Sequence, residues 1–426
     1  MTAASLIETI QPAHETIWRR FIAADGALLD YTGADGGTLL PDVEDHRDNR
    51  PNALGWWTSA ENGPFFGGLY LSALCDRYLI AHEPLIASRA SSIARWLLSL
   101  AVASQPGFIA RGLGPDGKSH YRASSSDQTY PWFYCMWRYA ASGIPTGNDR
   151  AVIVAAMDRT ARALVASSWR IYCAPPSFGY FGNLAGGFAD GAGDLRGEEP
   201  AFDAAVRILF IHRAMADLTG DAFWTDRYRS LAAETVNARG ETRITFCSRG
   251  AQYAAPGASP HYPDNTNLWT SASSQAGLRA LYDMETDSRI REQFQRGLSL
   301  NAERALVHLP EHRHFDNDSK LQASPDWRKL NELWKPQETI EDAVRVATAQ
   351  YGMWHNGISP RKQHESIFMR DPLFAGWIVA LSGDAHHITA GRQLMERMLQ
   401  HYRWDRMFSV FFFMAECMTY RLGISG

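Results

Sequence analysis

Apolar residues recur at intervals of three and four positions along the whole chain. Ile86, Ala90, Ile93 and Leu97 follow this spacing in one segment, and similar runs occur from end to end. This period places apolar side chains on one face of an α-helix, whereas a half-buried strand alternates with a period of two. Alternating patterns are nearly absent, so the sequence predicts an all-α protein.

The predicted helices are of two alternating kinds. Helices with one charged face are expected at residues 12–24, 84–103, 149–167, 222–237, 287–307 and 385–402. Helices that are apolar nearly all round, or rich in small residues, are expected at 64–80, 130–141, 200–218, 268–283, 372–381 and 407–422. A helix without a polar face must be enclosed. We therefore expect six outer helices around six inner ones.

The connections between these helices differ in length. Inner helices lead to outer ones through short turns, and the stretches 218–222 and 381–385 are near copies, each with a Gly-Asp pair. Outer helices lead to inner ones through long loops, apart from the last, and such loops usually carry function. The pattern predicts one (α/α)6 toroid over residues 1–426, with its long loops on the active-site face. A further helix near residues 340–351 is interpreted as an insertion.

Prolines mark the expected starts of the inner helices. Pro64, Pro131, Pro200 and Pro372 suit a first helical position, where no N–H is needed. Six helix N-termini on one face would offer partial positive charge and free N–H groups, which favour an anionic ligand.

Composition excludes several classes of function. The 426 residues include 42 Lys and Arg against 46 Asp and Glu, so the net charge of −4 provides no basic field for nucleic acid. No signal segment and no run of about 18 apolar residues is visible, so we expect a cytoplasmic protein without membrane contact. Five scattered cysteines are expected to be reduced and buried. Without HExxH, clustered Cys/His ligands, a P-loop or GxGxxG, we expect no metal and no cofactor.

The densest set of reactive side chains precedes the second inner helix. This loop holds Arg111, Lys118, Tyr121, Asp127 and Gln128. Asp127 is expected just before the helix, at the mouth of the toroid, where partial burial could raise its pKa and suit a general acid. The alternative is that Ser126 or Asp127 only caps the helix.

A second set precedes the first inner helix. Glu61 is the candidate partner carboxylate, Trp56 and Trp57 are candidates for a stacking wall, and Asn62 is a candidate ligand. Glycosidases commonly need two carboxylates, one to protonate the leaving oxygen and one to activate water or attack carbon. Alternatively, Glu61 stabilises the helix dipole and Asn62 is the cap.

Two later segments add candidates for binding the substrate. One contains His261 and Asn265, and the other contains His355, Arg361 and Arg370. Amides and imidazoles suit sugar hydroxyls, and either arginine could hold a uronate through a bidentate pair. The alternative is that Arg370 pairs with a neighbouring acid.

The segments 61–71, 125–128 and 370–371 resemble those of the six-hairpin glycosidase superfamily, in particular unsaturated glucuronyl and rhamnogalacturonyl hydrolases and related β-glucuronidases. In the unsaturated uronyl hydrolases, an aspartate at the start of an inner helix protonates the C4=C5 double bond and helps water to add. Asp127 matches that aspartate by placement. The resemblance implies either hydration or ordinary glycosidic hydrolysis here.

The leading hypothesis is hydrolysis of a terminal uronosyl residue from an oligosaccharide. Asp127 would be the acid/base and Glu61 the second carboxylate, with the substrate's carboxylate held by Arg111, Lys118, Arg361 or Arg370. One alternative is a polysaccharide lyase on the same toroid, with Tyr121 or His261 as the base. Another is a toroid that binds carbohydrate without catalysis.

Overall fold

The computed structural model describes residues 3–186, 201–253, 256 and 267–425. Its inner helices are α3 (Gly68–Ala81), α5 (Ser126–Ala141), α7 (Phe202–Thr219), α10 (Leu268–Met284), α14 (Asp371–Leu381) and α16 (Phe413–Ser425). Each inner helix contacts the next, and α16 contacts α3, which closes a ring of six. The outer helices are α1 (Ala3–Arg20), α4 (Pro84–Val102), α6 (Gly147–Ala166), α8 (Ala222–Ala233), α11 (Ser288–Leu306) and α15 (Ala385–His401). The all-α (α/α)6 toroid is thus confirmed.

Burial follows the two kinds of sequence pattern. Every residue of α14 from Pro372 to Leu381 is buried, as an enclosed helix requires. In α11 the buried residues, including Phe294, Leu298 and Ala302, recur every three or four positions and so form one stripe. The pattern of apolar residues in the sequence therefore distinguishes the inner helices from the outer ones.

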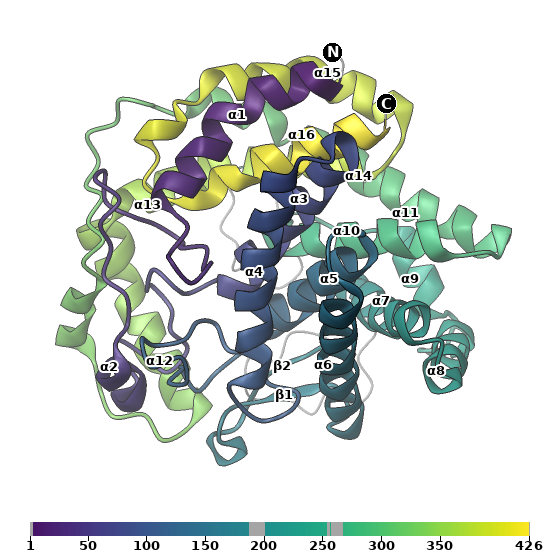
Figure 1. The fold of residues 1–426 in the computed structure, drawn as a ribbon, viewed down its shortest axis with the longest axis horizontal. Coiled ribbons are helices and arrows are strands. Elements are labelled where there is room, and N and C mark those ends of the chain that lie inside the picture. Colours follow the sequence, from purple (N-terminus) through teal and green to yellow (C-terminus); the bar gives the residue numbers. More distant parts are fainter. Residues whose placement is uncertain (1–2, 187–200, 254–255, 257–266, 426) are drawn as a thin grey trace.

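The two ends of the chain meet in the wall of the ring. Figure 1 shows α1 and α16, in purple and yellow, side by side, and the two helices are in contact. A buried polar cluster joins them, because His14 Nδ1 lies 2.9 Å from Glu416 Oε2 and the hydroxyl of Tyr70 donates to Glu416 Oε1 at 3.2 Å. Buried charges need such partners.

The short turns form as the sequence predicts. Gly220 ends α7 in the left-handed conformation, and the carboxylate of Asp221 accepts from the N–H of Phe223 at 2.9 Å. Gly383 has a positive φ of 63° between α14 and α15, and Asp384 accepts from the N–H of His386 at 3.0 Å. Glycine tolerates this backbone conformation, and aspartate satisfies the first free N–H groups of the next helix.

The long connections carry additional elements. The expected insertion contains α12 (Ile340–Gly352), η5 (Met353–Ile358), α13 (Pro360–Glu365) and η6 (Ser366–Arg370). It packs on the ring through an aromatic cluster in which Trp354 lies against Tyr31, and Tyr31 against Phe408. The others are α2 (Val43–Asp48), η1 (Gly63–Gly67), η2 (Pro176–Phe178), α9 (Arg243–Arg249), η3 (Leu309–His314), η4 (Trp327–Leu333), η7 (Trp404–Arg406) and η8 (Val410–Phe412). Strands β1 (Arg170–Tyr172) and β2 (Tyr180–Asn183) pair antiparallel.

Several predicted helix starts were wrong. Helix α16 begins at Phe413 rather than at residue 407. Helix α1 begins at Ala3 rather than at Pro12, which lies inside it. Helix α5 begins at Ser126, so Pro131 is interior and Asp127 lies in the first turn. Because Pro131 has no N–H, the only helical bond that it removes is the one to the carbonyl of Asp127. The predicted start at Pro200 falls outside the described residues.

Helix α4 is more apolar than the sequence analysis expected of any segment. Its length and hydropathy are sufficient for a membrane span, and 44% of its most apolar window is buried. In the structure it packs against α3, α5 and α6. Its apolar face is therefore part of the helix packing of the toroid.

Candidate active site

A cavity of about 900 Å³ opens where the six inner helices begin. The residues that line it at those six starts are Glu61, Asn62 and Phe66 for α3, 125–127 for α5, Asp203 and Arg207 for α7, 267–270 for α10, 370–372 for α14 and Phe411 for α16. This confirms that the inner helices begin on one face. The π-helical segments η1, η5 and η6 all contribute lining residues, and π-helical turns are frequent at functional sites.

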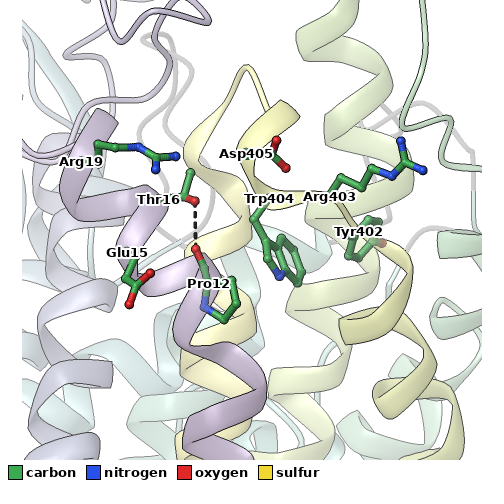
Figure 2. A pocket seen from close by; sticks show the side chains of 8 residues that line it. All are labelled: Pro12, Glu15, Thr16, Arg19, Tyr402, Arg403, Trp404 and Asp405. Carbon is green, nitrogen blue, oxygen red and sulfur yellow. Dashed lines mark hydrogen bonds between the residues drawn. The ribbon is translucent and has the colours of Figure 1, made fainter.

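A smaller hollow of about 330 Å³ lies between α1 and residues 402–405 (Figure 2). Its charged side chains balance, because it is lined by two acidic residues, Glu15 and Asp405, and by two basic residues, Arg19 and Arg403. The hydroxyl of Thr16 donates to the carbonyl of Pro12 within the same helix. Because its charges are balanced, we assign the candidate site to the larger cavity.

Arg111 connects the two chain segments that carry the predicted carboxylates. Its Nη1 donates to the backbone carbonyl of Glu61 at 3.0 Å, and its Nη2 donates to the hydroxyl of Ser125 at 2.9 Å. Ser125 in turn donates to Oδ1 of Asp127. Arg111 is buried, with a relative exposure of 2%. Its guanidinium therefore holds the starts of two adjacent inner helices in a fixed relation, with Glu61 and Asp127 on the same cavity.

A buried network extends this arrangement behind the wall. Asp30 accepts from the backbone N–H of Asn62 at 3.0 Å and from its side-chain amide at 2.7 Å. The oxygen of Asn62 accepts from Gln128 Nε2 at 3.0 Å, and Gln128 Oε1 accepts from the N–H of Phe65 at 3.2 Å. Asn62 lines the cavity, whereas the fully buried Gln128 positions its neighbours. Burial raises the pKa of Asp30 to about 7, and the nearby charge of Glu61 adds to this effect while that of Lys362 opposes it.

Lys362 supplies the cation beside Glu61. Its Nζ lies 3.6 Å from Glu61 Oε2 and 3.9 Å from Asp30 Oδ2, over the ring of Tyr31. The N–H of Trp57 donates a hydrogen bond to Glu61 Oε2 at 3.0 Å. These contacts orient Glu61, whose side chain is 15% exposed.

Aromatic rings form the adjoining wall, as predicted for Trp56 and Trp57. The two indoles meet edge to face, and Trp56 also contacts Phe181. Trp57 contacts Tyr351 and His355, which come from the insertion. All five side chains line the cavity. Flat apolar rings of this kind suit the faces of sugar rings.

His355 is held in its neutral form. Burial lowers its pKa to about 3, and the positive charges of Lys362 and Arg370 lower it further. Its Nδ1 is buried and has no hydrogen-bond partner in the described part of the chain. A neutral imidazole between two cations can donate to or accept from a ligand, but it is a weak base.

Arg370 lies across the cavity on two aromatic faces. Its guanidinium is 4.7 Å from the ring of Trp269 and 5.4 Å from that of Phe411. Its Nε donates to Asp371 at 2.8 Å, which is the pairing that the alternative interpretation expected. Among the described residues, none bonds to its two Nη atoms, so these remain for a ligand. Asp371 begins α14 directly after helical η6, so it does not cap an isolated helix start.

Other predicted ligands lie elsewhere. Arg361 is buried, with Nε bonded to Glu365 and Nη1 to the carbonyl of Asp316. Lys118 is exposed in a turn. The hydroxyl of buried Tyr121 donates to the carbonyl of Arg50, and burial raises its pKa well above the usual value. None of these three is among the described residues that line the cavity, which corrects the expectation that they belong to the candidate site. His261 and Asn265 lie outside the described residues.

Several lining residues were missed from the sequence. Asp203 and Arg207 lie on α7, and Asp30 lies behind the wall. Each is a charge in an otherwise apolar run, which is a signal that sequence inspection could have used, because an isolated buried charge needs a partner. Lys362 directly follows the predicted Arg361. His308 and Glu311 also line the cavity; Glu311 lies in the 3-10 turn η3 and His308 directly precedes it, where the sequence shows no periodic pattern.

Gly63 lies in close contact with the backbone of Arg111 and the ring of Trp96. A Cβ atom at this position would lie 2.1 Å from the carbonyl oxygen of Arg111 and 2.6 Å from the ring of Trp96. We expect Gly63→Ala to lower the free energy of unfolding by about 1–3 kcal/mol, because a backbone carbonyl cannot move away cheaply. Urea unfolding followed by circular dichroism would measure the change.

Gly147→Ala is the matched control. A Cβ there meets nothing within 4 Å, so the same substitution should leave stability unchanged or raise it slightly. Equal effects of the two substitutions would show that the close approach at Gly63 has no energetic importance.

Metal binding finds no support in the described ranges, where no group of three or more His, Cys, Asp or Glu side chains is placed to hold an ion. The five cysteines are free and buried. The charged side chains that line the cavity are carboxylates, among them Glu61 and Asp127, and several cations, and an aromatic wall adjoins them.

No protein-family model matches the chain, and no curated protein sequence matches it. Solved structures similar to it include the crystal structure of a D-mannose isomerase, at 11% identity and a TM-score of 0.46, with 98% of this chain and 97% of that one covered. Another is the crystal structure of a sugar epimerase from a ruminal bacterium, at 9% identity and a TM-score of 0.42, with 92% and 86% covered. The family of the chain stays a prediction from its sequence.

Proposed function

We propose that this protein is a glycoside hydrolase that removes a terminal uronosyl residue from an oligosaccharide. The observation that carries the proposal is the linkage of Glu61 and Asp127 on one cavity through Arg111 and Ser125. Two carboxylates beside a sugar-sized cavity are what glycosidic hydrolysis requires. The resemblance of residues 61–71 and 125–128 to six-hairpin glycosidases supports the same reaction.

In this proposal Asp127 is the acid/base. On a saturated uronoside it protonates the glycosidic oxygen as the C–O bond breaks, and Glu61 assists the water or attacks the anomeric carbon. On an unsaturated uronoside Asp127 protonates C4 of the double bond and water adds at C5, which gives a hemiketal that opens and releases the leaving sugar. The ion pair with Lys362 orients Glu61 in either case.

The substrate's carboxylate is assigned to the group formed by Arg370, Lys362 and neutral His355. The Nη atoms of Arg370, which no described residue bonds, can donate two hydrogen bonds to a carboxylate in a bidentate geometry, and the positive ends of the inner helices add a favourable field. A lyase is less well supported. Of the two bases expected for a lyase, Tyr121 is buried and donates to the carbonyl of Arg50, and His261 lies outside the described residues.

Arg370→Gln should weaken the binding of uronosyl substrates. A hydrogen bond to a charged group contributes about 1.5–3 kcal/mol, so we expect KM to rise about 10- to 100-fold. The control is a neutral glycoside with a CH₂OH group in place of the carboxylate, for which KM should change much less. A similar loss on both substrates would mean that Arg370 does not hold the carboxylate.

A panel of saturated and unsaturated uronosyl oligosaccharides tests the function itself. Mass spectrometry should show release of one uronic acid unit from the non-reducing end. Ultraviolet absorbance distinguishes the routes, since loss of a C4=C5 chromophore indicates hydration and an unchanged absorbance indicates ordinary hydrolysis. A newly formed chromophore would show a lyase, and no change in any member of the panel would contradict the proposed substrate class.

A further inference from the structure

Two charged residues on α7 line the cavity without pairing with each other. Asp203 and Arg207 are four residues apart on one helix face, a spacing at which opposite charges commonly form an ion pair. Here Oδ1 of Asp203 instead accepts from the hydroxyl of Ser271 at 2.9 Å. In the described part of the chain, the guanidinium of Arg207 has neither a carboxylate nor a hydrogen-bond partner, and its Nε is fully buried.

An unpaired guanidinium in a partly enclosed cavity is energetically unfavourable unless a ligand satisfies it. Burial removes water from a charged group, and a carboxylate or sulfate oxygen would restore the lost hydrogen bonds. Arg207 is held in place over the ring of Tyr130, at 5.6 Å from the ring centroid. It lies near the N-terminal end of α7, where the helix dipole also favours an anion.

Arg207 is separate from the group assigned to the uronate. In the inner ring α7 lies between α5 and α10, whereas Arg370 precedes α14. Asp127, at the start of α5, is on the helix next to Arg207. A substrate that is bound at Arg370 and reaches Asp127 with its scissile bond would have its leaving unit beside α7. The cavity volume of about 900 Å³ is near the upper end for a small-ligand site, which leaves room for a second ring.

We infer that Asp203 and Arg207 form a second subsite, which binds an acidic sugar unit on the leaving side of the scissile bond. Arg207 binds the carboxylate or sulfate group of that unit. The free oxygen of Asp203 accepts a hydrogen bond from one of its hydroxyls. This inference rests on the proposed hydrolysis, which fixes the position of the scissile bond. It goes beyond that proposal because hydrolysis itself does not require an acidic group on the leaving sugar.

The test compares disaccharides that share one uronosyl unit and differ in the leaving sugar, which carries a carboxylate, a sulfate ester or neither. In the wild type we expect kcat/KM to be at least about 10-fold higher for one or both acidic leaving sugars than for the neutral one. In Arg207→Gln this preference should fall to about one, because kcat/KM should fall far more for the acidic leaving sugars than for the neutral one. Arg229→Gln removes the same charge from an exposed position on α8 and should keep the preference.

Binding to Asp127→Asn by calorimetry separates this inference from the proposed function. If no disaccharide is cleaved but Arg207→Gln in that background selectively weakens binding of the doubly acidic one, the hydrolysis is wrong and the subsite stands. If cleavage occurs and the preference for acidic leaving sugars is absent or survives Arg207→Gln, the subsite is wrong and the hydrolysis stands. The sulfate and carboxylate series show which anion the subsite prefers.

Discussion

Replacing Asp127 with asparagine is expected to lower kcat on uronosyl oligosaccharides by about 10²- to 10⁴-fold, the usual contribution of a general acid or base. Asparagine keeps the oxygen that accepts from Ser125, so the contacts of Ser125 and Arg111 should persist. It cannot transfer a proton to the substrate. Substrate binding should therefore change little while turnover is lost, and steady-state kinetics together with calorimetry would separate the two effects.

Asp149→Asn provides the matched control. Asp149 also lies in the first turn of a helix, but it is exposed on α6 and bonded to the capping Thr146. The same substitution there should leave kcat unchanged. If Asp127→Asn retains full activity, Asp127 has only a structural role at the start of α5. If neither the wild type nor Asp127→Asn cleaves any substrate and both bind it equally well, the protein is a toroid that binds without catalysis.

The buried carboxyl of Asp30 is expected to give folding a distinct dependence on pH. Its pKa is raised to about 7 in the folded protein, whereas an unfolded aspartate titrates near 3.9. Between these values the folded state keeps a proton that the unfolded state has lost. The free energy of unfolding should therefore fall as the pH rises through this window, by an amount on the order of 4 kcal/mol, and stay level above it.

Asp30→Asn removes this titration. The variant also alters one hydrogen bond to Asn62, which costs stability equally at all pH values, so the slope against pH is the informative quantity. Urea unfolding at a series of pH values should show a shallower decline for the variant than for the wild type between about pH 4 and 7. Identical slopes would show that Asp30 is ionised throughout this range.

Asp116→Asn is a control of opposite sign. Hydrogen bonds from the N–H groups of Ser119 and Lys118 lower the pKa of exposed Asp116 to about 2. Its folded state favours the ionised form, so its contribution to stability is lost as the pH falls toward 2. Removing it should leave the slope of the free energy of unfolding against pH unchanged between about pH 5 and 7.

The toroid was predictable because burial imposes a pattern on the sequence. Helix α14 must be apolar on all sides to lie inside the ring, whereas α11 needs only one apolar stripe. The start of α5 was not predictable from Pro131, because a helix tolerates proline in its second turn when only one backbone bond is lost. Ser125, in an extended conformation, sets the start instead.

The candidate site was predictable only where reactive residues cluster in the chain. Glu61 and Asp127 each lie in a segment with other polar and aromatic residues, and both line the cavity. Asp30 and Lys362 are 332 positions apart by their numbers, and their proximity arises from the packing of the insertion on the ring. Arg361 and Lys362 are adjacent in sequence, yet the helix directs one to Glu365 and the other to the cavity.

Closure of the ring by α16 has a consequence for how the protein reaches its working state. The contact between Tyr70 and Glu416 spans 346 residues, and such long-range pairing is slow to form. While a ribosome is still making residues 413–425, the facing sides of α3 and α14 have no neighbour and leave apolar surface open to aggregation or chaperone binding. Because Phe411, just before α16, lines the cavity, we expect nascent chains to become competent for sugar binding only after the sixth inner helix has been released.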